Sequence, residues 1–276
     1  MSVAFVKPNE ILAPYIERYW MFDNADSPAS FMPQIPPGVG LDMFVHYAGS
    51  FTTENGTTLP HAHIVFSGQN SCKIFSVSNV HFIAIRFRAG ALRNFTDIPL
   101  CQLLDANPAV EDIWGVSGKN LVARITGIEE KDETINQLEL FLEKKLNENH
   151  KDTTAWNVII QKLYRHYDSV TIDGVSKKMN ISNRHFRRRF TEETGFAPKH
   201  FQQLARFHAT IKPLLLNRER AYLPTALGNG YFDQTHFIKE FKYFMNCTPS
   251  AFLQDNNFMS HFYYPSLNGQ GNFVKK

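Results

Sequence analysis

The sequence predicts an α+β protein, in which a strand-rich N-terminal domain precedes an all-α C-terminal domain with two helix-turn-helix units. Three observations predict this class. Short segments rich in β-branched and aromatic residues, separated by proline, glycine and asparagine, dominate the front of the chain. Apolar residues change to helical spacing from residue 132 onward. The C-terminal half contains an internal repeat whose copies carry helix caps and breakers.

The first 126 residues are expected to form mainly short strands. Residues 41–47, 63–66 and 81–88 are the clearest segments. The last of these alternates in a way that predicts one apolar strand face. On its other face, Arg86 and Arg88 could bind an anionic effector, but pairing with carboxylates across the sheet is the favoured alternative.

A helix is expected over residues 132–146, because its apolar residues recur every three or four positions. This stripe consists of Ile135, Leu138, Phe141, Leu142 and Leu146. Such a stripe usually packs on its own domain, although a dimer seam is the alternative. The polar residues 147–151 then predict a linker. We therefore expect a strand-rich domain over 1–147, a helical domain over 152–255 and a C-terminal tail over 256–276.

Charge divides the chain at the same place. The net charge of +3 is the sum of −6 over residues 1–150, +7 over residues 151–255 and +2 in the tail. A hydrophobic content of 43% with 20% charged residues excludes a disordered chain. Three cysteines exclude a disulfide scaffold. Without a signal peptide or a membrane-spanning apolar run, the expected location is cytoplasmic.

An internal repeat with an offset of 51 residues is the strongest feature of the basic half. The copies read Ser182-x3-Phe186-x3-Phe190-x4-Gly195-x2-Pro198-x2-Phe201 and Asp233-x3-Phe237-x3-Phe241-x4-Asn246-x2-Pro249-x2-Phe252. In each copy the first residue suits a helix N-cap, and two phenylalanines four residues apart share one helix face. Glycine or asparagine suits the left-handed position that ends a helix, and proline opens the next one.

A short helix and a tight turn precede each of these capped helices. Thr171 is the expected N-cap of the first short helix, and residues 223–227 form the second. The small residues Ser176 and Ala226 mark where each helix pair crosses closely. A short helix, a turn and a capped second helix are typical of the helix-turn-helix motif.

The face opposite each phenylalanine pair is polar and, in the first copy, strongly cationic through Arg184, Arg187 and Arg188. Such side chains contact phosphates and base edges when a helix enters the major groove of DNA. A merely solvated charged face is the alternative. Two helix-turn-helix units in one basic domain favour the DNA-binding interpretation.

Residues 230–242, Gly-Tyr-Phe-Asp-Gln-Thr-His-Phe-Ile-Lys-Glu-Phe-Lys, together with residues 249–252, resemble the signature of the AraC/XylS family of bacterial transcription regulators. Residues 194–201 are similar to the end of that family's first helix-turn-helix. The resemblance covers about residues 152–254. It implies seven helices, including a long linking helix near 199–216.

The resemblance also implies the residues that contact DNA. They are Asn183, Arg184, His185, Arg187, Arg188, Gln234, Thr235, His236 and Lys239. Two departures from the family pattern affect the expected geometry. Pro213 is expected to kink or shorten the linking helix. Ile238 could meet a thymine methyl group, or it could indicate that the second helix mainly contacts the backbone.

Residues 36–45, 85–91 and 110–115 resemble an uncharacterised N-terminal domain type that often precedes this DNA-binding domain. The resemblance implies a sensor or dimerisation domain, without identifying a ligand. A metal site built from His46, His61, His63 and His81 is the alternative use of this domain, but ordinary surface and strand histidines are favoured. No nucleophile motif or phosphate-binding loop is present, so neither enzyme activity nor a cofactor is expected.

The resulting hypothesis is a cytoplasmic, sequence-specific transcription factor that binds double-stranded DNA and is controlled through its N-terminal domain. RNA polymerase and a small-molecule effector are the further partners expected, with no membrane, and the state is a monomer or homodimer. The expected effect on transcription is activation, although nothing in the sequence separates activation from repression. The alternatives are a metal-dependent enzyme domain fused to a DNA-targeting domain, and an effector-independent DNA-binding protein.

Overall fold

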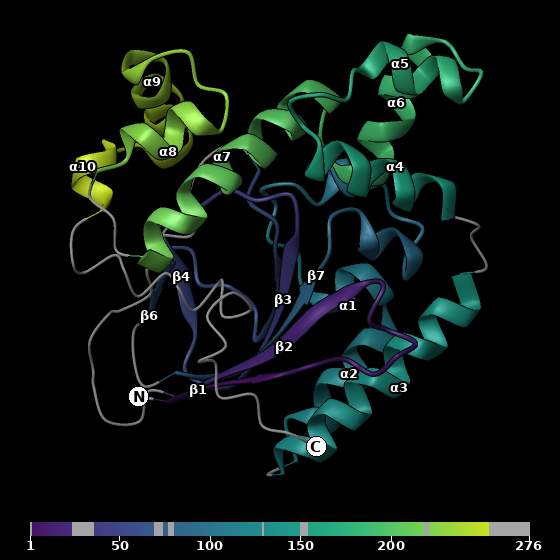
Figure 1. Cartoon of the computed structure of the whole chain (residues 1–276). Helices are drawn as coiled ribbons and strands as arrows, with labels where there is room; N and C mark the ends of the chain where they lie inside the picture. Colours follow the sequence, from purple (N-terminus) through teal and green to yellow (C-terminus); the bar gives the residue numbers. More distant parts are fainter. Residues whose placement is uncertain are drawn as a thin grey trace.

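The computed structural model describes residues 2–23, 36–68, 74–76, 80–128, 130–149, 154–217 and 221–253. The expected tail over 256–276 lies outside these residues, as do positions 150 and 151 of the expected linker. The architecture is the α+β class predicted from the sequence, with an antiparallel sheet in the N-terminal half and helices throughout the C-terminal half (Figure 1). No helix in the described ranges is both long and apolar enough to span a membrane.

Five strands form the main antiparallel sheet in the order β1-β2-β7-β3-β5. They are β1 (Ser2–Val6), β2 (Ile16–Asp23), β7 (His81–Phe87), β3 (Leu41–Ala48) and β5 (Ala62–Val65). The short strands β4 (Phe51–Thr53) and β6 (Ile74–Ser76) pair separately. The three strands expected from the sequence are confirmed.

Both faces of the sheet are buried, so the expectation of a single apolar face on β7 is wrong. Trp20 lies on one face, where its ring contacts Phe44 and Phe82 at 5.7 and 4.9 Å. Its neighbour Tyr19 lies on the other face and is fully buried there. A layer on each side of the sheet covers these residues, which a reading of one strand in isolation could not indicate.

Arg86 of β7 lies directly opposite Asp42 of β3, and the two form an ion pair at 2.5 Å. Arg88 donates instead to the carbonyl of Ala13 at 3.1 Å. The favoured alternative, cross-strand pairing with a carboxylate, is therefore confirmed for Arg86.

Residues 91–125 form short helices, so the expectation of strands up to residue 126 is wrong for this segment. The helices are η1 (Ala91–Asn94), η2 (Leu100–Gln102), α1 (Val110–Trp114) and α2 (Val116–Ile125). In α2, Leu121 and Ile125 are buried with helical spacing. Gly115 has φ of +57°, which allows the sharp turn between α1 and α2.

The amphipathic helix α3 (Lys131–Asn149) covers the expected residues 132–146 and continues to Asn149. Ile135, Leu138 and Leu142 are fully buried in the core of this chain. Phe141 and Leu146 are partly buried against the same core. The stripe therefore packs within its own chain.

Seven helices follow in the described part of the chain, the number that the family resemblance implies. They are α4 (Thr154–Arg165), α5 (Ile172–Lys178), α6 (Asn183–Thr194), α7 (Pro198–Asn217), α8 (Leu223–Gly228), α9 (Gln234–Met245) and α10 (Pro249–Phe252). The α5–α6 and α8–α9 pairs lie on either side of α7 (Figure 1). Pro213 lies inside α7, which continues to Asn217 and is not shortened.

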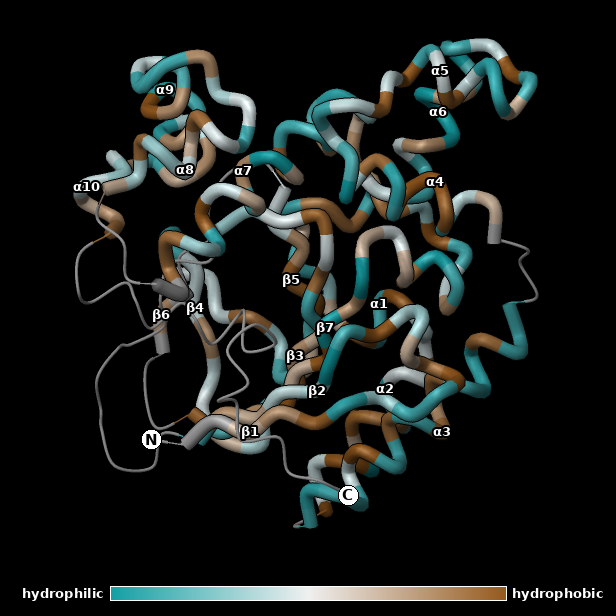
Figure 2. The backbone as a smooth tube through the Cα atoms, in the orientation of Figure 1, coloured by the Kyte–Doolittle hydropathy of each residue, from teal (hydrophilic) through white to brown (hydrophobic). Residues whose placement is uncertain are grey.

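The distribution of hydrophobic and hydrophilic residues follows this arrangement of strands and helices (Figure 2). Hydrophobic colour is concentrated in the sheet and on inward-facing helical positions, and hydrophilic colour covers much of α5 and α6. The buried residues of both halves form one contiguous core. The helical half is therefore packed on the front half over part of its surface.

Candidate nucleic-acid interface

The second helix of the first unit, α6, is built as the repeat predicts. The Ser182 hydroxyl accepts a hydrogen bond from the backbone N–H of His185 at 3.2 Å. Phe186 and Phe190 are completely buried. Gly195 ends the helix with φ of +84°. These local interactions fix which face of α6 is turned outward.

The outward face presents the cationic side chains. Arg184, His185, Arg187 and Arg188 are all exposed. Arg188 lies 3.8 Å from Glu192, but its side chain is 67% exposed and such surface pairs contribute little. Arg184 and Arg187 form no ion pair with any residue that the structure describes. The arginine side chains are therefore available to a polyanion.

Asn183 has a different role in this structure. Its amide nitrogen donates to Asp173 at 2.6 Å, and its amide oxygen accepts from the hydroxyl of Ser176. Both partners lie on α5. Asn183 therefore joins the two helices of the unit, while the arginines that follow it face outward.

The second unit repeats this construction in α9. The Asp233 carboxylate accepts from the backbone N–H of His236 at 2.7 Å. Phe237 and Phe241 are fully buried, and Asn246 ends the helix in the left-handed conformation with φ of +54°. The predicted caps, buried faces and helix ends are thus confirmed in both units.

The outer face of α9 is polar and less cationic than that of α6. Thr235, Lys239 and Lys242 are exposed. Gln234 is exposed as well, and its amide donates to the hydroxyl of Tyr222 at 3.2 Å. Ile238 is only half-buried. This face can form phosphate contacts through lysines and base contacts through Thr235 and Gln234.

His236 contacts residues of its own helix-turn-helix unit. Its Nδ1 accepts from the backbone N–H of Phe232 at 3.3 Å, and its ring lies 5.2 Å from that of Tyr231. This arrangement resembles a capping box, in which a side chain at the third helical position satisfies a backbone donor before the helix. His236 therefore stabilises the start of α9.

A buried polar cluster anchors α9 to the linking helix. Arg206 of α7 pairs with Glu240 at 2.5 Å, and the hydroxyl of Tyr231 donates to the same carboxylate at 2.5 Å. Burial and the Glu240 charge raise the pKa of Tyr231, so this phenol stays protonated. The second unit is thus held on α7 by its own side chains.

Helix α7 joins the two units and packs against both. Phe201 contacts Phe190 of α6 at 5.2 Å, and Phe207 contacts Phe244 of α9 at 4.8 Å. Both units are therefore anchored on the first half of α7.

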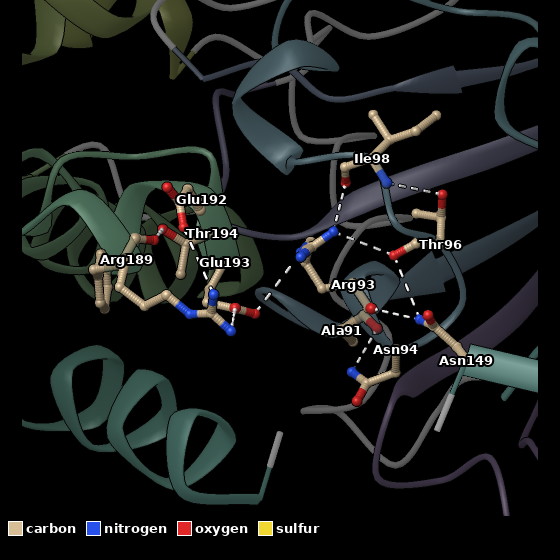
Figure 3. A network of polar contacts seen from close by, with 11 residues as sticks. Ala91, Arg93, Asn94, Thr96, Ile98, Asn149, Arg189, Glu192, Glu193 and Thr194 are labelled. Carbon is tan, nitrogen blue, oxygen red and sulfur yellow. Dashed lines mark hydrogen bonds and ion pairs between the residues drawn. The ribbon is translucent and has the colours of Figure 1, made fainter. Parts of the chain in front are cut away.

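The first unit also contacts the front domain through a polar network that the sequence did not predict (Figure 3). Glu193 at the end of α6 is buried between two arginines. Arg189 lies 3.0 Å from its carboxylate, and Arg93 of η1 lies 3.8 Å away on the other side. The guanidinium of Arg93 also donates to the carbonyl of Ile98 at 3.0 Å. The spacing of four residues between Arg189 and Glu193 was the available signal.

Further contacts join the front domain to the helical half. The rings of Phe66 and Phe196 meet edge to face at 5.2 Å. On α7, His208 Nε2 lies 2.5 Å from the carbonyl oxygen of Pro37. Burial lowers the pKa of His208 to about 4, and the nearby cations act in the same direction, so the ring is neutral at pH 7.

The histidines of the front domain are not gathered into a recognisable metal site. His46 and His63 stack at 5.4 Å, and burial lowers their pKa values to about 3 and about 4. His81 lies 3.4 Å from Asp23 instead. Within the described residues, no three His, Cys, Asp or Glu side chains are placed to share a metal ion.

In comparisons with known proteins, the front half and the helical half of the chain match different family models. Residues 175–255 match a family model described as "Helix-turn-helix domain", and residues 4–108 match "Domain of unknown function (DUF6597)". The comparison with curated proteins gave no match.

Three similar solved structures are of ToxT from Vibrio cholerae. The structure from strain O395 is 15% identical over 91% of this chain and 95% of ToxT, with a TM-score of 0.41. A 1.65 Å form is 15% identical over 84% and 97%, with a TM-score of 0.45. An unsaturated fatty acid bound form from strain SCE256 is 14% identical over 91% and 93%, with a TM-score of 0.43. From its matched domains, the chain joins a domain of unknown function (DUF6597) to an AraC-type helix-turn-helix domain.

Proposed function

We propose that this protein binds double-stranded DNA sequence-specifically, with α6 and α9 in successive major-groove segments. The observation that carries the proposal is the capped helix-turn-helix unit that occurs twice against α7, with cationic or polar residues facing outward in both. Lys and Arg contacts with phosphates supply affinity, which falls steeply with salt. Arg184, Arg187 and Arg188 supply base contacts from the first unit.

Selection from a random duplex library, followed by fluorescence anisotropy titrations, tests this proposal. The wild-type chain is expected to enrich one bipartite sequence with its halves about one helical turn apart. The double variant Arg184→Ala/Arg188→Ala is expected to lose about 1–3 kcal/mol of binding free energy for each base contact removed. Arg124→Ala, an exposed arginine on α2, is the matched control. Equal binding by both variants would show that α6 is not a reading helix.

The proposed control by the front domain acts through the first unit. Glu193 and Phe196 both contact the front domain, and Glu193 lies at the end of α6 itself. A change in the position of η1 would therefore reach the reading helix directly. Arg93 is in turn fixed by Asn149, whose amide donates to the Arg93 carbonyl at 2.9 Å.

A pocket of about 430 Å³ in the front domain is where an effector would bind in this proposal. It lies between the ends of β2, β3 and β7 and the start of α3, within the size range of small-molecule sites. Its lining includes Met21, Tyr47, Ala48, His81, Ile128 and Thr134. Helix α3 begins at this pocket and ends at Asn149, beside Arg93. It thus connects the pocket with the network around Glu193.

A melting-temperature screen of small metabolites against the full chain tests effector control. Compounds that raise the melting temperature are expected to change DNA affinity in the wild type and to lose both effects in Ala48→Trp, which fills the pocket. An effect that persists in Ala48→Trp would place the effector elsewhere. If nothing in a broad screen changes DNA affinity, the effector-independent alternative is favoured.

The remaining expectations are tested separately. Sedimentation of the purified chain distinguishes a monomer from a homodimer, and a pull-down tests contact with RNA polymerase. Elemental analysis tests the alternative of a metal-dependent enzyme domain, since a stoichiometric metal would support it.

A further inference from the structure

Phe232, the residue before the N-cap of α9, is unusually exposed for a phenylalanine. Phe232 has 88% of its surface accessible, the largest fraction among the exposed large hydrophobic residues that the structure describes. It immediately precedes the N-cap Asp233. A phenyl ring this exposed buries little apolar surface on folding, and it is accessible to a binding partner.

The internal repeat supplies a direct comparison. The equivalent residue of the first unit, 51 positions earlier, is Ile181, which is half-buried and packs against the core. An apolar residue before an N-cap commonly packs against the fourth helical residue and fixes the entry of the chain. Ile181 is consistent with that arrangement, and Phe232 departs from it.

The structure shows why Phe232 does not pack inward. The fourth residue of α9 is Phe237, whose ring is already flanked by Tyr231 at 5.0 Å and Tyr222 at 5.3 Å. The backbone of Phe232 is held by the hydrogen bond from its N–H to His236 Nδ1. The phenyl ring is thus presented outward from a fixed backbone.

The surroundings indicate the chemistry of its partner. Thr235, Lys239 and Lys242 on α9 are exposed, and the N-terminal residues of a reading helix are those that meet base edges. A partner that is both anionic and apolar at its contact edge fits this setting. In the major groove, the C5-methyl group of thymine is the apolar feature that side chains contact.

We propose that Phe232 contacts the C5-methyl group of a thymine in the DNA half-site bound by the second unit. This inference rests on the proposed DNA-binding function and adds one base preference to it. The sequence offered Ile238 for such a contact, but Ile238 is half-buried while Phe232 is fully projecting.

Uracil substitution tests the contact, because uracil lacks only the methyl group of thymine. Duplexes of the sequence selected by the wild-type chain are made with each thymine of one half-site replaced in turn. At one position the wild type is expected to lose about fourfold in affinity, as for one buried methyl-sized group. Phe232→Ala is expected to bind the thymine duplex about fourfold more weakly and to show no response to uracil at that position.

Two matched variants complete the experiment. Val158→Ala removes another exposed apolar side chain, on α4, and is expected to respond to uracil as the wild type does. Ile238→Ala is expected to retain the response. The inference is overturned if Phe232→Ala responds to every uracil as the wild type does, or if Ile238→Ala alone loses the response. Loss of self-association in Phe232→Ala with unchanged uracil response would also overturn it, in favour of a protein interface.

Failure of this inference is distinguishable from failure of the proposed function. If the wild type enriches no sequence, DNA reading itself fails. If it enriches a sequence that depends on Arg184 and Arg188 but not on Phe232, only the thymine contact fails. Because Phe232 is exposed, its truncation is expected to leave the melting temperature unchanged, which separates base contact from folding.

Discussion

The two helix-turn-helix units share a pattern but are held in place differently. The second is fixed to α7 by its own cluster of Arg206, Glu240 and Tyr231. The first is fixed partly by the front domain, through Glu193 and its contact with Arg93. The comparison teaches that one unit can be influenced by the front domain while the other follows α7.

The residues that end α6 and α9 show the same contrast. Gly195 and Asn246 both adopt positive φ. A Cβ atom on Gly195 would lie 2.8 Å from the ring of Phe66 in the front domain, so only glycine fits there. Asn246 is exposed and tolerates a side chain. Domain docking has therefore added a steric requirement to one copy of the repeat.

The largest effect is expected from the buried phenylalanines. Phe190→Ala and Phe241→Ala each remove a ring from the core of one unit and are expected to cost about 3–5 kcal/mol in the free energy of unfolding. Chemical denaturation followed by circular dichroism measures both. If the front domain supports the first unit, Phe190→Ala also loosens the domain contact, and limited proteolysis would cut between the domains. Equal proteolysis of both variants would contradict that part of the comparison.

A smaller loss of unfolding free energy is expected from a change in the polar network around Glu193. Glu193→Gln leaves Arg93, which is buried, with a weakened partner and is expected to cost about 2–3 kcal/mol in unfolding free energy. In the proposed mechanism it also changes DNA affinity through the first unit. Glu192→Gln is the control, because Glu192 lies 3.8 Å from Arg188 in a partly exposed pair. Identical results for Glu192→Gln and Glu193→Gln would remove Glu193 from the control mechanism.

Acid is expected to weaken the docking of α7 through His208. Its folded pKa is about 4, mainly because of burial, with Arg86 and Lys212 contributing and the Pro37 hydrogen bond and Glu17 opposing. The unfolded chain binds this proton near pH 6.5, so the contribution of His208 to the free energy of unfolding is constant above that pH and falls by about 1.4 kcal/mol per pH unit toward pH 4.

Denaturation at pH 7, 6 and 5 measures this dependence. His46 and His63 contribute in the same direction and remain in every variant, because their folded pKa values are also lowered. His208→Gln keeps a donor for the Pro37 carbonyl and is expected to reduce the slope by about one proton. An unchanged slope would mean that His208 is not buried neutral in solution.

The smallest effect is expected from the helix caps. Ser182→Ala and Asp233→Ala each remove one side-chain acceptor from a helix start and are expected to cost about 1 kcal/mol in unfolding free energy. The two values should agree closely, because this feature is local to each copy. A much larger cost at Ser182 would indicate that its cap also supports the domain contact.

Much of the helical half was predictable because its signals are local. A cap acts on backbone groups three residues away, and phenylalanines four residues apart share a helix face. Three of the four helices in residues 91–125 have only three to five residues, which is too few to show a helical period. The contacts of Asn183 were missed, since its partners lie on the neighbouring helix α5. The contact of His236 was missed although its partner, the backbone N–H of Phe232, is only four residues away.

By itself the sequence determined two capped helix-turn-helix units, the cationic face of the first, and the acidic and basic halves that sum to +3. Only the tertiary structure decided that both sheet faces are buried and that Glu193 meets Arg93. The physical reason is distance along the chain. Spacing of three to four residues leaves a periodic trace in the sequence, whereas contacts between residues a hundred positions apart leave none.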